Sequence, residues 1–253
     1  MRAVDILGVR VDDVTYAESV ALIERFVQER GPHLVVTPNP EIVMLARRDP
    51  LFRAALARSA LAIPDGIGLL WAARWLGSPL REHVRGTDLI YRLAARSAQL
   101  GWRWYLLGAA DGVAKLAAVD LERRYPGLTV VGAAPGSPHA RDDQAVRRLI
   151  ASSGPVDVIL VAYGAPTQEL WLGRNLGPLD IPVGIGVGGV LDYLSGRVPR
   201  APRWMRRLEL EFLHRLVAEP WRWRRQLALP RFALLAASAA VRVRLAGPAR
   251  RAV

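Results

Sequence analysis

The stretch "VDVILVAYGAPTQELWLGRNLG", residues Val156 to Gly177, contains a predicted strand, turn and helix in that order. Its first half is short and mostly β-branched or aliphatic and ends at Gly164, which is typical of a strand. Pro166 then favours a helix start, because proline suits the first turn of a helix. Five more runs are also predicted to be strands: "HLVVT" (33–37), "LAIP" (61–64), "WRWYLLG" (102–108), "TVVGAA" (129–134) and "IPVGIGVG" (181–188).

Helical patterns lie between these runs. A helix is predicted from Thr15, where Thr15 and Glu18 form a capping box, and another from Asn39, with Pro40 at its first position. Further helices are predicted over 87–100, from about 111, and from Pro166. This alternation predicts an α/β fold: an open, mostly parallel, Rossmann-like sheet with helices on both faces. Ligands of such sheets bind at the carboxyl ends of the strands.

The pattern changes after about Gly196. The remaining residues read as successive helices broken at Pro220 and Pro230, with no further strand. We therefore expect an α/β catalytic domain over 1–196 and a basic helical, membrane-associating appendage over 197–253. The appendage has fourteen arginines, no lysine and three glutamates, so it carries almost all of the net charge of +12.

A basic segment beside a near-neutral body suggests an anionic partner such as lipid headgroups, a lipid diphosphate or nucleic acid. The alternatives are a solvated arginine-rich tail, helices that cover the sheet, or a contact in a homo-oligomer. "FALLAASAAV" (232–241), flanked by arginines, is a further candidate to lie at a membrane interface, although it is too short to span one.

Several kinds of site are disfavoured. The chain has no cysteine, so it has no disulfide, thiolate zinc site or cysteine nucleophile. The N-terminus lacks the apolar core of a signal peptide. The four histidines show no ligand spacing, and the pairs Asp12–Asp13 and Asp142–Asp143 are more typical of turns and helix starts, where capping is the expected role.

Polar and glycine-rich segments follow several predicted strands. Thr37 and Asn39 lie in "TPNPE", Asp65 in "IPDGIG" and Gln168 in "GAPTQELW". Asp65 is the one carboxylate in an apolar stretch. It is either the N-cap of the helix that starts near Ile67 or a partly desolvated general base. Glycines that would allow backbone to approach a phosphate are Gly108, Gly164, Gly188 and Gly189, although tight packing is an alternative role.

Eight motifs occur in an order that resembles the WecG/TagA/CpsF family of bacterial glycosyltransferases, glycosyltransferase family 26, over roughly residues 5 to 228. They are "TPNPEIV", "PDGIGLLW", "GTDL", "GAPTQELW", "GVGGVLDYLSG", "RAPRWM", "LELEFLHRL" and "EPWRWRRQ". The resemblance implies transfer of a sugar, often of the N-acetylmannosamine type, from a UDP-sugar to a polyprenyl-diphosphate-linked sugar. It also implies that the reaction takes place at the cytoplasmic face of the plasma membrane and needs no metal or other cofactor.

The resemblance also implies roles for particular residues. Asp65 corresponds to the proposed base, Thr37 and Asn39 line its pocket, and Gln168 matches the glutamine of the "GAPxQE" motif. Two positions depart from the family: His83 replaces a common arginine, with Arg85 nearby, and Thr167 replaces a lysine. We expect glycine backbone, Arg85 and the appendage arginines Arg215, Arg222 and Arg225 to bind a diphosphate, since arginine binds two phosphate oxygens at once.

Two other functions remain open from the residues. One is a nucleotide-binding α/β module without chemistry, against which the joint presence of Asp65, Asn39 and Gln168 argues. The other is a nucleic-acid binder that uses the arginines and Trp204, Trp221 and Trp223 of the appendage. Tryptophan beside arginine is equally typical of a lipid interface, and we favour the membrane over nucleic acid.

Overall fold

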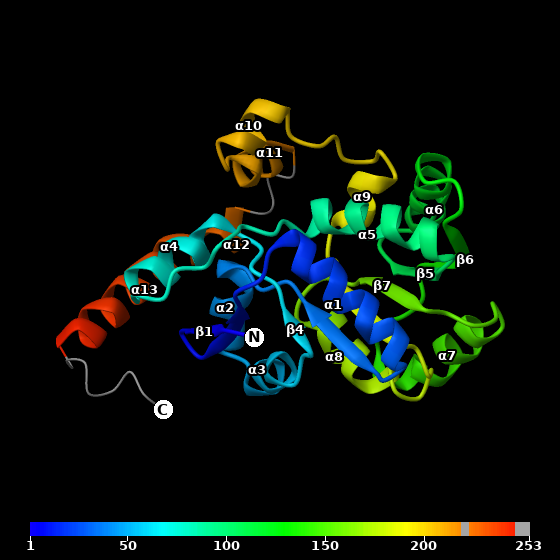
Figure 1. Cartoon of the computed structure of the whole chain (residues 1–253), viewed down its shortest axis with the longest axis horizontal. Helices are drawn as coiled ribbons and strands as arrows, with labels where there is room; N and C mark the ends of the chain where they lie inside the picture. The colour runs from blue at the N-terminus through cyan, green and yellow to red at the C-terminus, as the bar shows by residue number, and fades with distance from the viewer. Residues whose placement is uncertain (219–222, 246–253) are drawn as a thin grey trace.

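The computed structural model describes residues 1–218 and 223–245. Its centre is a six-stranded parallel sheet in the order β4-β3-β8-β7-β5-β6, which confirms the open α/β class (Figure 1). All six predicted strands are present: β3 (His33–Val36), β4 (Leu61–Ala62), β5 (Arg103–Gly108), β6 (Thr129–Ala134), β7 (Val158–Ala162) and β8 (Val183–Gly186). The central strand β7 is buried along its whole length, because helices cover both of its faces.

Two hydrophobic cores lie on opposite faces of this sheet. One is formed with α1 (Tyr16–Glu29), α5 (Gly86–Leu100), α6 (Val113–Arg124) and α9 (Val190–Leu194). The other is formed with α2 (Pro40–Ala46), α3 (Pro50–Ala57), α4 (Ile67–Trp75), α7 (Asp143–Ala151, preceded by the short 3-10 helix η1, Ala140–Asp142) and α8 (Thr167–Asn175). The sheet is therefore buried at its centre, and its strand ends are left to carry the polar residues.

Local sequence signals placed several helices correctly. The capping box of Thr15 and Glu18 starts α1, and the Asn39 side chain accepts a hydrogen bond from the Ile42 amide at the start of α2, where Pro40 is the first residue. Both ends of α5 agree with the prediction to within one residue.

The N-terminus differs from the prediction. It forms an antiparallel hairpin of β1 (Ala3–Ile6) and β2 (Val9–Asp12). Asp12 therefore lies in a strand, and its carboxylate accepts a hydrogen bond from the Ala62 amide at 2.8 Å. Asp13 binds the Arg81 amide and guanidinium. The predicted capping role is wrong for this pair, because both carboxylates instead accept hydrogen bonds from a backbone amide and from an arginine side chain.

The second carboxylate pair does not cap a helix either. Asp142 stands at the N-cap position of α7, but its side chain accepts from the Ser137 hydroxyl at 2.6 Å. Asp143 binds the guanidinium of Arg174, which approaches from α8 at 2.8 Å. Both pairs thus join segments that are distant in the chain.

The C-terminal part is helical, as predicted: α10 (Arg203–Arg207), α11 (Glu211–Ala218), α12 (Trp223–Gln226) and α13 (Ala228–Leu245). Pro220 lies outside the described residues. Pro230 does not break a helix, because it occupies the first turn of α13, where a backbone N–H has no intrahelical acceptor. Within 1–218 and 223–245, no helix is long and apolar enough to cross a membrane.

Helix α13 packs along α2 and α4 (Figure 1). Its buried residues are Phe232, Ala236 and Ala240, which recur at four-residue spacing and so form one face of the helix. The opposite face exposes Leu234 and Val241. Helix α13 thus forms a layer over α2 and α4 and is not a separate tail.

Replacing Gly108 by alanine should destabilise the fold. Gly108 has φ +102°, and an added Cβ would lie 2.9 Å from the backbone carbon of Ala162. The control is Gly112→Ala, at φ +76° with no atom within 4 Å of the added Cβ. Left-handed strain alone costs about 1–3 kcal/mol, so urea denaturation should show a clearly larger loss for Gly108→Ala. Equal losses would contradict the packing role of Gly108.

Candidate active site

The carboxyl ends of four neighbouring strands, β4, β3, β8 and β7, open into one cavity of about 850 Å³. This volume is typical of small-molecule sites. Eight of the predicted site residues line it: Thr37, Asn39, Asp65, Arg85, Gly164, Gln168, Gly188 and Gly189. Segments as far apart as residues 37 and 189 meet here because their strands are adjacent in the sheet.

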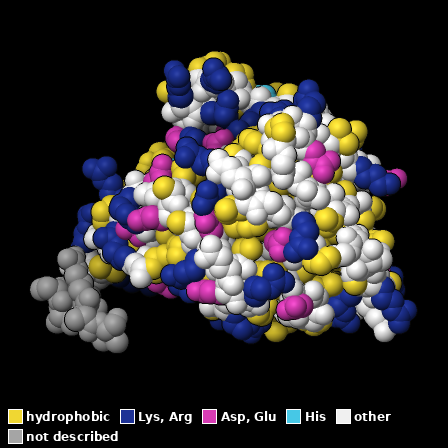
Figure 2. All heavy atoms as spheres, turned by 45° about the vertical axis from the view of Figure 1, so that its right-hand side comes forward, with side chains coloured by type: hydrophobic (Ala, Val, Ile, Leu, Met, Phe, Trp, Pro, Cys, Tyr) yellow, Lys and Arg dark blue, Asp and Glu magenta, His cyan; other side chains and the backbone are white. Residues whose placement is uncertain are grey.

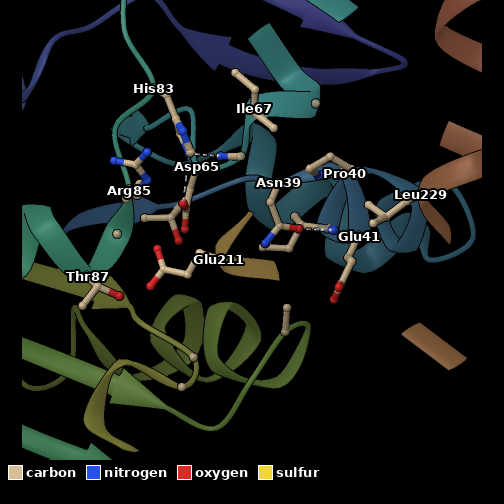
Figure 3. Close-up of a pocket in the computed structure, with 18 of the residues that line it drawn as sticks. Asn39, Pro40, Glu41, Asp65, Ile67, His83, Arg85, Thr87, Glu211 and Leu229 are labelled. Carbon is tan, nitrogen blue, oxygen red and sulfur yellow. Dashed lines mark hydrogen bonds and ion pairs between the residues drawn. The ribbon is translucent and has the colours of Figure 1, made fainter. Parts of the chain in front are cut away.

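Asp65 follows β4 with its carboxylate at the cavity (Figure 3). Its side chain is about one-third exposed, and its Oδ1 lies 3.8 Å from Nε2 of His83. The N-cap of α4 is Gly66, with no side-chain cap among the described residues, so the capping alternative for Asp65 is wrong. Gly86 leaves room for the carboxylate, because a Cβ at that position would come within 3.2 Å of Asp65 Oδ2.

Thr37 and Asn39 follow β3 on the same side of the sheet. The Thr37 hydroxyl is 3.5 Å from the Gly186 carbonyl oxygen, so it lies between β3 and β8. Asn39 caps α2 through its Oδ1 and reaches into the cavity (Figure 3). Asn39 therefore has both roles: it is the N-cap of α2, and it lines the cavity.

Gln168 acts through the backbone around it. Its Oε1 accepts hydrogen bonds from the amides of Gly164 at 3.1 Å and Gly188 at 2.9 Å, and its Nε2 donates to the buried Glu169. Burial raises the pKa of the Glu169 carboxyl. Gln168 thus ties the turn after β7 to the turn after β8 and sets the shape of the glycine-lined wall.

Acidic residues from the C-terminal segment also reach the cavity. Glu209 pairs with the Arg85 guanidinium, and its Oε2 lies 2.7 Å from Nδ1 of His83. Glu211 lies 3.4 Å from Arg200, which is also 2.7 Å from Asp88 in the first turn of α5. The ion-pair cluster of Arg85, Asp88, Arg200, Glu209 and Glu211 therefore fastens residues 200–211 beside the strand ends.

Sequence reasoning did not identify Glu209, Glu211 or Arg200 as parts of the site. The motif "LELEFLHRL" was noted only as part of the family pattern. The signal in the sequence is two glutamates that closely follow an arginine-rich segment. This pattern predicts that the glutamates pair with cations, but it does not predict which cations. His83 was noted only as a departure from the family.

Part of the remaining wall is apolar. Leu229, Pro230 and Phe232 of α13 line the cavity, as do Trp71 and Trp75 of α4. Trp71 is 55% exposed and Trp75 37%. One side of the cavity thus continues onto an exposed hydrophobic surface.

Four predicted residues are not brought to the cavity by any described contact. Gly108 lies at the end of β5, one strand beyond β7, where its backbone packs against Ala162. Gly108 thus has a packing role, and its predicted phosphate role stays a prediction. The backbones of Arg215 and Arg225 belong to α11 and α12, but their side chains are outside the described part of the structure, as is all of Arg222. Over 1–218 and 223–245, no group of three His, Asp or Glu side chains could hold a metal ion.

Comparison with known proteins adds independent evidence. A sequence model of the glycosyl transferase WecG/TagA/CpsF family matches residues 4–246, so the resemblance continues past Pro230 and includes all of α13. A relative from Bacillus spizizenii is 35% identical over 81% of this chain and 78% of its own. A relative from Bacillus subtilis is 33% identical over 84% of this chain and 82% of its own.

A third relative, from Staphylococcus aureus, is 29% identical over 90% of both chains. All three carry the name N-acetylglucosaminyldiphosphoundecaprenol N-acetyl-beta-D-mannosaminyltransferase. The family match and the residues around the cavity agree, so the predicted enzyme class is confirmed: the chain belongs to the WecG/TagA/CpsF family of glycosyltransferases.

Proposed function

We propose that this enzyme moves an N-acetylmannosamine-type sugar from a UDP-sugar to a polyprenyl-diphosphate-linked sugar, with inversion at the transferred carbon. The observation that carries the proposal is Asp65, a cavity-facing carboxylate with no capping role, in a chain whose named relatives are mannosaminyltransferases of a diphosphoundecaprenol substrate. Inversion needs one base for the acceptor hydroxyl and a means to stabilise the departing diphosphate.

Asp65 is suited to the role of base. Its carboxylate is partly shielded from water and faces the space between the Gly86 backbone and the Asn39 side chain. In the proposed step, the acceptor hydroxyl oxygen attacks the anomeric carbon of the donor sugar while its proton passes to Asp65. The bond from that carbon to the UDP oxygen breaks, and UDP leaves with the electron pair.

Three helices begin at the cavity and support binding of the diphosphate. They are α4, α5 and α8, and at none of the three does the side chain of the N-cap residue bond the amides of the first turn. Free amides and the positive end of the helix dipole both favour an anion. The turns at Gly164 and Gly188, braced by Gln168, add close backbone approach without side-chain bulk. Helix N-termini and arginines would then stabilise the leaving group without a metal.

An exposed surface beside the cavity supports docking on the inner face of the plasma membrane. Its hydrophobic residues are Trp71, Trp204, Leu208, Trp223 and Leu227, each more than half exposed. Arg203 and Arg207 flank Trp204 on α10, and basic and hydrophobic side chains gather on this projecting part of the molecule (Figure 2). Tryptophan with arginine suits the headgroup region, and the polyprenyl chain of the acceptor would remain in the bilayer.

The test of the function is transfer measured across a panel of UDP-sugars with a short-chain lipid-diphosphate N-acetylglucosamine acceptor. UDP-N-acetylmannosamine should give a disaccharide-lipid product detected by mass spectrometry. If every UDP-sugar in the panel leaves this acceptor unchanged at a membrane-mimicking surface, the proposed function is wrong.

Asp65→Asn should lower kcat by about 10²-fold or more, because the amide cannot take the hydroxyl proton. The change keeps the size of the side chain, so donor binding and the unfolding transition should stay near those of the wild type. Asp180→Asn, at an exposed position, is the matched control and should keep full activity. Near-normal turnover in Asp65→Asn would remove this residue from the role of base.

Transfer should survive chelation of divalent cations, since amides and arginines are proposed to stabilise the departing diphosphate. The measurement is initial rate with and without EDTA in the presence of a fixed acceptor concentration. A rate that collapses in EDTA and returns with Mg²⁺ or Mn²⁺ would contradict metal-free transfer.

The double variant Arg203→Gln/Arg207→Gln should bind anionic liposomes about tenfold or more weakly, because each basic residue near an anionic surface contributes on the order of 1 kcal/mol. Binding of the wild type should weaken as salt rises. Arg53→Gln/Arg148→Gln removes two exposed arginines from α3 and α7, on the other side of the molecule, and should bind normally. Equal losses in both double variants, or a preference for oligonucleotides over liposomes, would argue against the membrane surface.

A further inference from the structure

His83 connects the C-terminal segment to the turn that carries Asp65. Its side chain is 12% exposed and lines the cavity. One ring nitrogen, Nδ1, is 2.7 Å from Glu209 Oε2, and the other, Nε2, is 2.8 Å from the Gly66 amide nitrogen. Nε2 is also 3.8 Å from Asp65 Oδ1 (Figure 3).

These contacts define the neutral form of the ring. The Gly66 N–H is a donor, so Nε2 must accept and carries no proton. The proton of a neutral imidazole then sits on Nδ1 and is donated to the Glu209 carboxylate. In this form His83 accepts from the Gly66 amide, where φ is +134°, and donates no hydrogen bond to Asp65.

A second proton would change these contacts at one atom. Nε2 would become a donor, could no longer accept from the Gly66 amide, and would turn its N–H toward Asp65 Oδ1. A carboxylate that accepts a charge-assisted hydrogen bond is a weaker base. The Nδ1–H bond to Glu209 is retained in both forms, so Glu209 serves as the fixed anchor.

We propose that His83, anchored by Glu209, is a positioning residue that supports the Asp65 turn when neutral and withdraws Asp65 from base catalysis when protonated. This inference rests on the proposed function, and it concerns a position at which this chain departs from the arginine common in the family.

The charges around the ring give the direction of the pH effect. Burial opposes the imidazolium, and the charge of Arg85 opposes it as well, but hydrogen bonding and charge from Asp65, with the charge of Glu209, raise the pKa of His83 above the ordinary value of a histidine. His83 is therefore neutral only above that raised pKa. Transfer should decline as the pH falls through it, beginning at a higher pH than for an ordinary histidine.

The first experiment measures kcat and kcat/KM against pH for the full-length enzyme, His83→Gln and Glu209→Gln. In His83→Gln, the amide oxygen of the introduced glutamine can accept from Gly66 but does not titrate, so the acid limb should move down by about one pH unit or more. Glu209→Gln removes a charge that favours the imidazolium and should shift the limb in the same direction. His139→Gln, the matched control, removes an exposed histidine that does not line the cavity and should leave the limb in place.

The second experiment needs no substrate. The chain has four histidines, so proton NMR can follow each imidazole, with His83 assigned by its absence in His83→Gln. The pKa of His83 should fall in both Asp65→Asn and Glu209→Gln. A His83 pKa that is unchanged in Asp65→Asn, or variants that slow transfer equally at all pH values, would overturn the proposal. Failure of the wild type to transfer any sugar would instead overturn the proposed function, while the titration would still decide whether His83 and Asp65 are coupled.

Discussion

The ion-pair cluster of Arg85, Asp88, Arg200, Glu209 and Glu211 is the interaction on which the active site depends. It joins the start of α5 to residues 200–211, which otherwise leave the α/β body after α9. Arg85 and Arg200 are about four-fifths buried, so each needs its carboxylates. Loss of one partner from a buried pair typically costs about 3–5 kcal/mol, because the remaining charge is left uncompensated. The pairs therefore specify where the C-terminal segment lies, whatever their net contribution to stability.

The sheet order explains why so few residues suffice for the site. Strands β4, β3, β8 and β7 are neighbours, although the chain visits β5 and β6 between β4 and β7. The turns after these four strands supply a carboxylate, an amide, a hydroxyl and two glycine-rich walls to one cavity. The strand β5 lies next in the sheet, and Gly108 at its end packs closely on Ala162 and does not line the cavity. A base and an anion site can thus be placed side by side without any long loop.

The parts predicted well from the sequence are those decided by local forces. The strands could be found because each is short, apolar and ended by glycine or proline, and the starts of α1 and α2 because Thr15 and Asn39 cap them. Thr37, Asn39, Asp65 and Gln168 were predicted from their places after strands and from the family motifs, and the cavity brings all four together.

The parts predicted poorly depend on distant partners. Asp12 looked like a turn residue because nothing near it in sequence shows that Ala62 would donate to it. Pro230 looked like a helix end because the chain before it does not show where α13 begins. Nothing near Glu209 and Glu211 in the sequence shows that they pair with the cations Arg85 and Arg200. A sequence alone does not specify such pairs, because they form only after the sheet has set the positions of the helices.

The position of the C-terminal segment can be measured directly, because the chain has no cysteine to interfere with labelling. Spin labels attached through Lys115→Cys on α6 and Arg207→Cys on α10, both exposed positions, would report the distance between the body and the segment. We predict one narrow distance distribution in otherwise unchanged protein, and a broad one once Arg85→Gln and Arg200→Gln remove the ion pairs. A broad distribution in the parent protein, or a narrow one that survives both substitutions, would contradict the claim that these pairs build the active site.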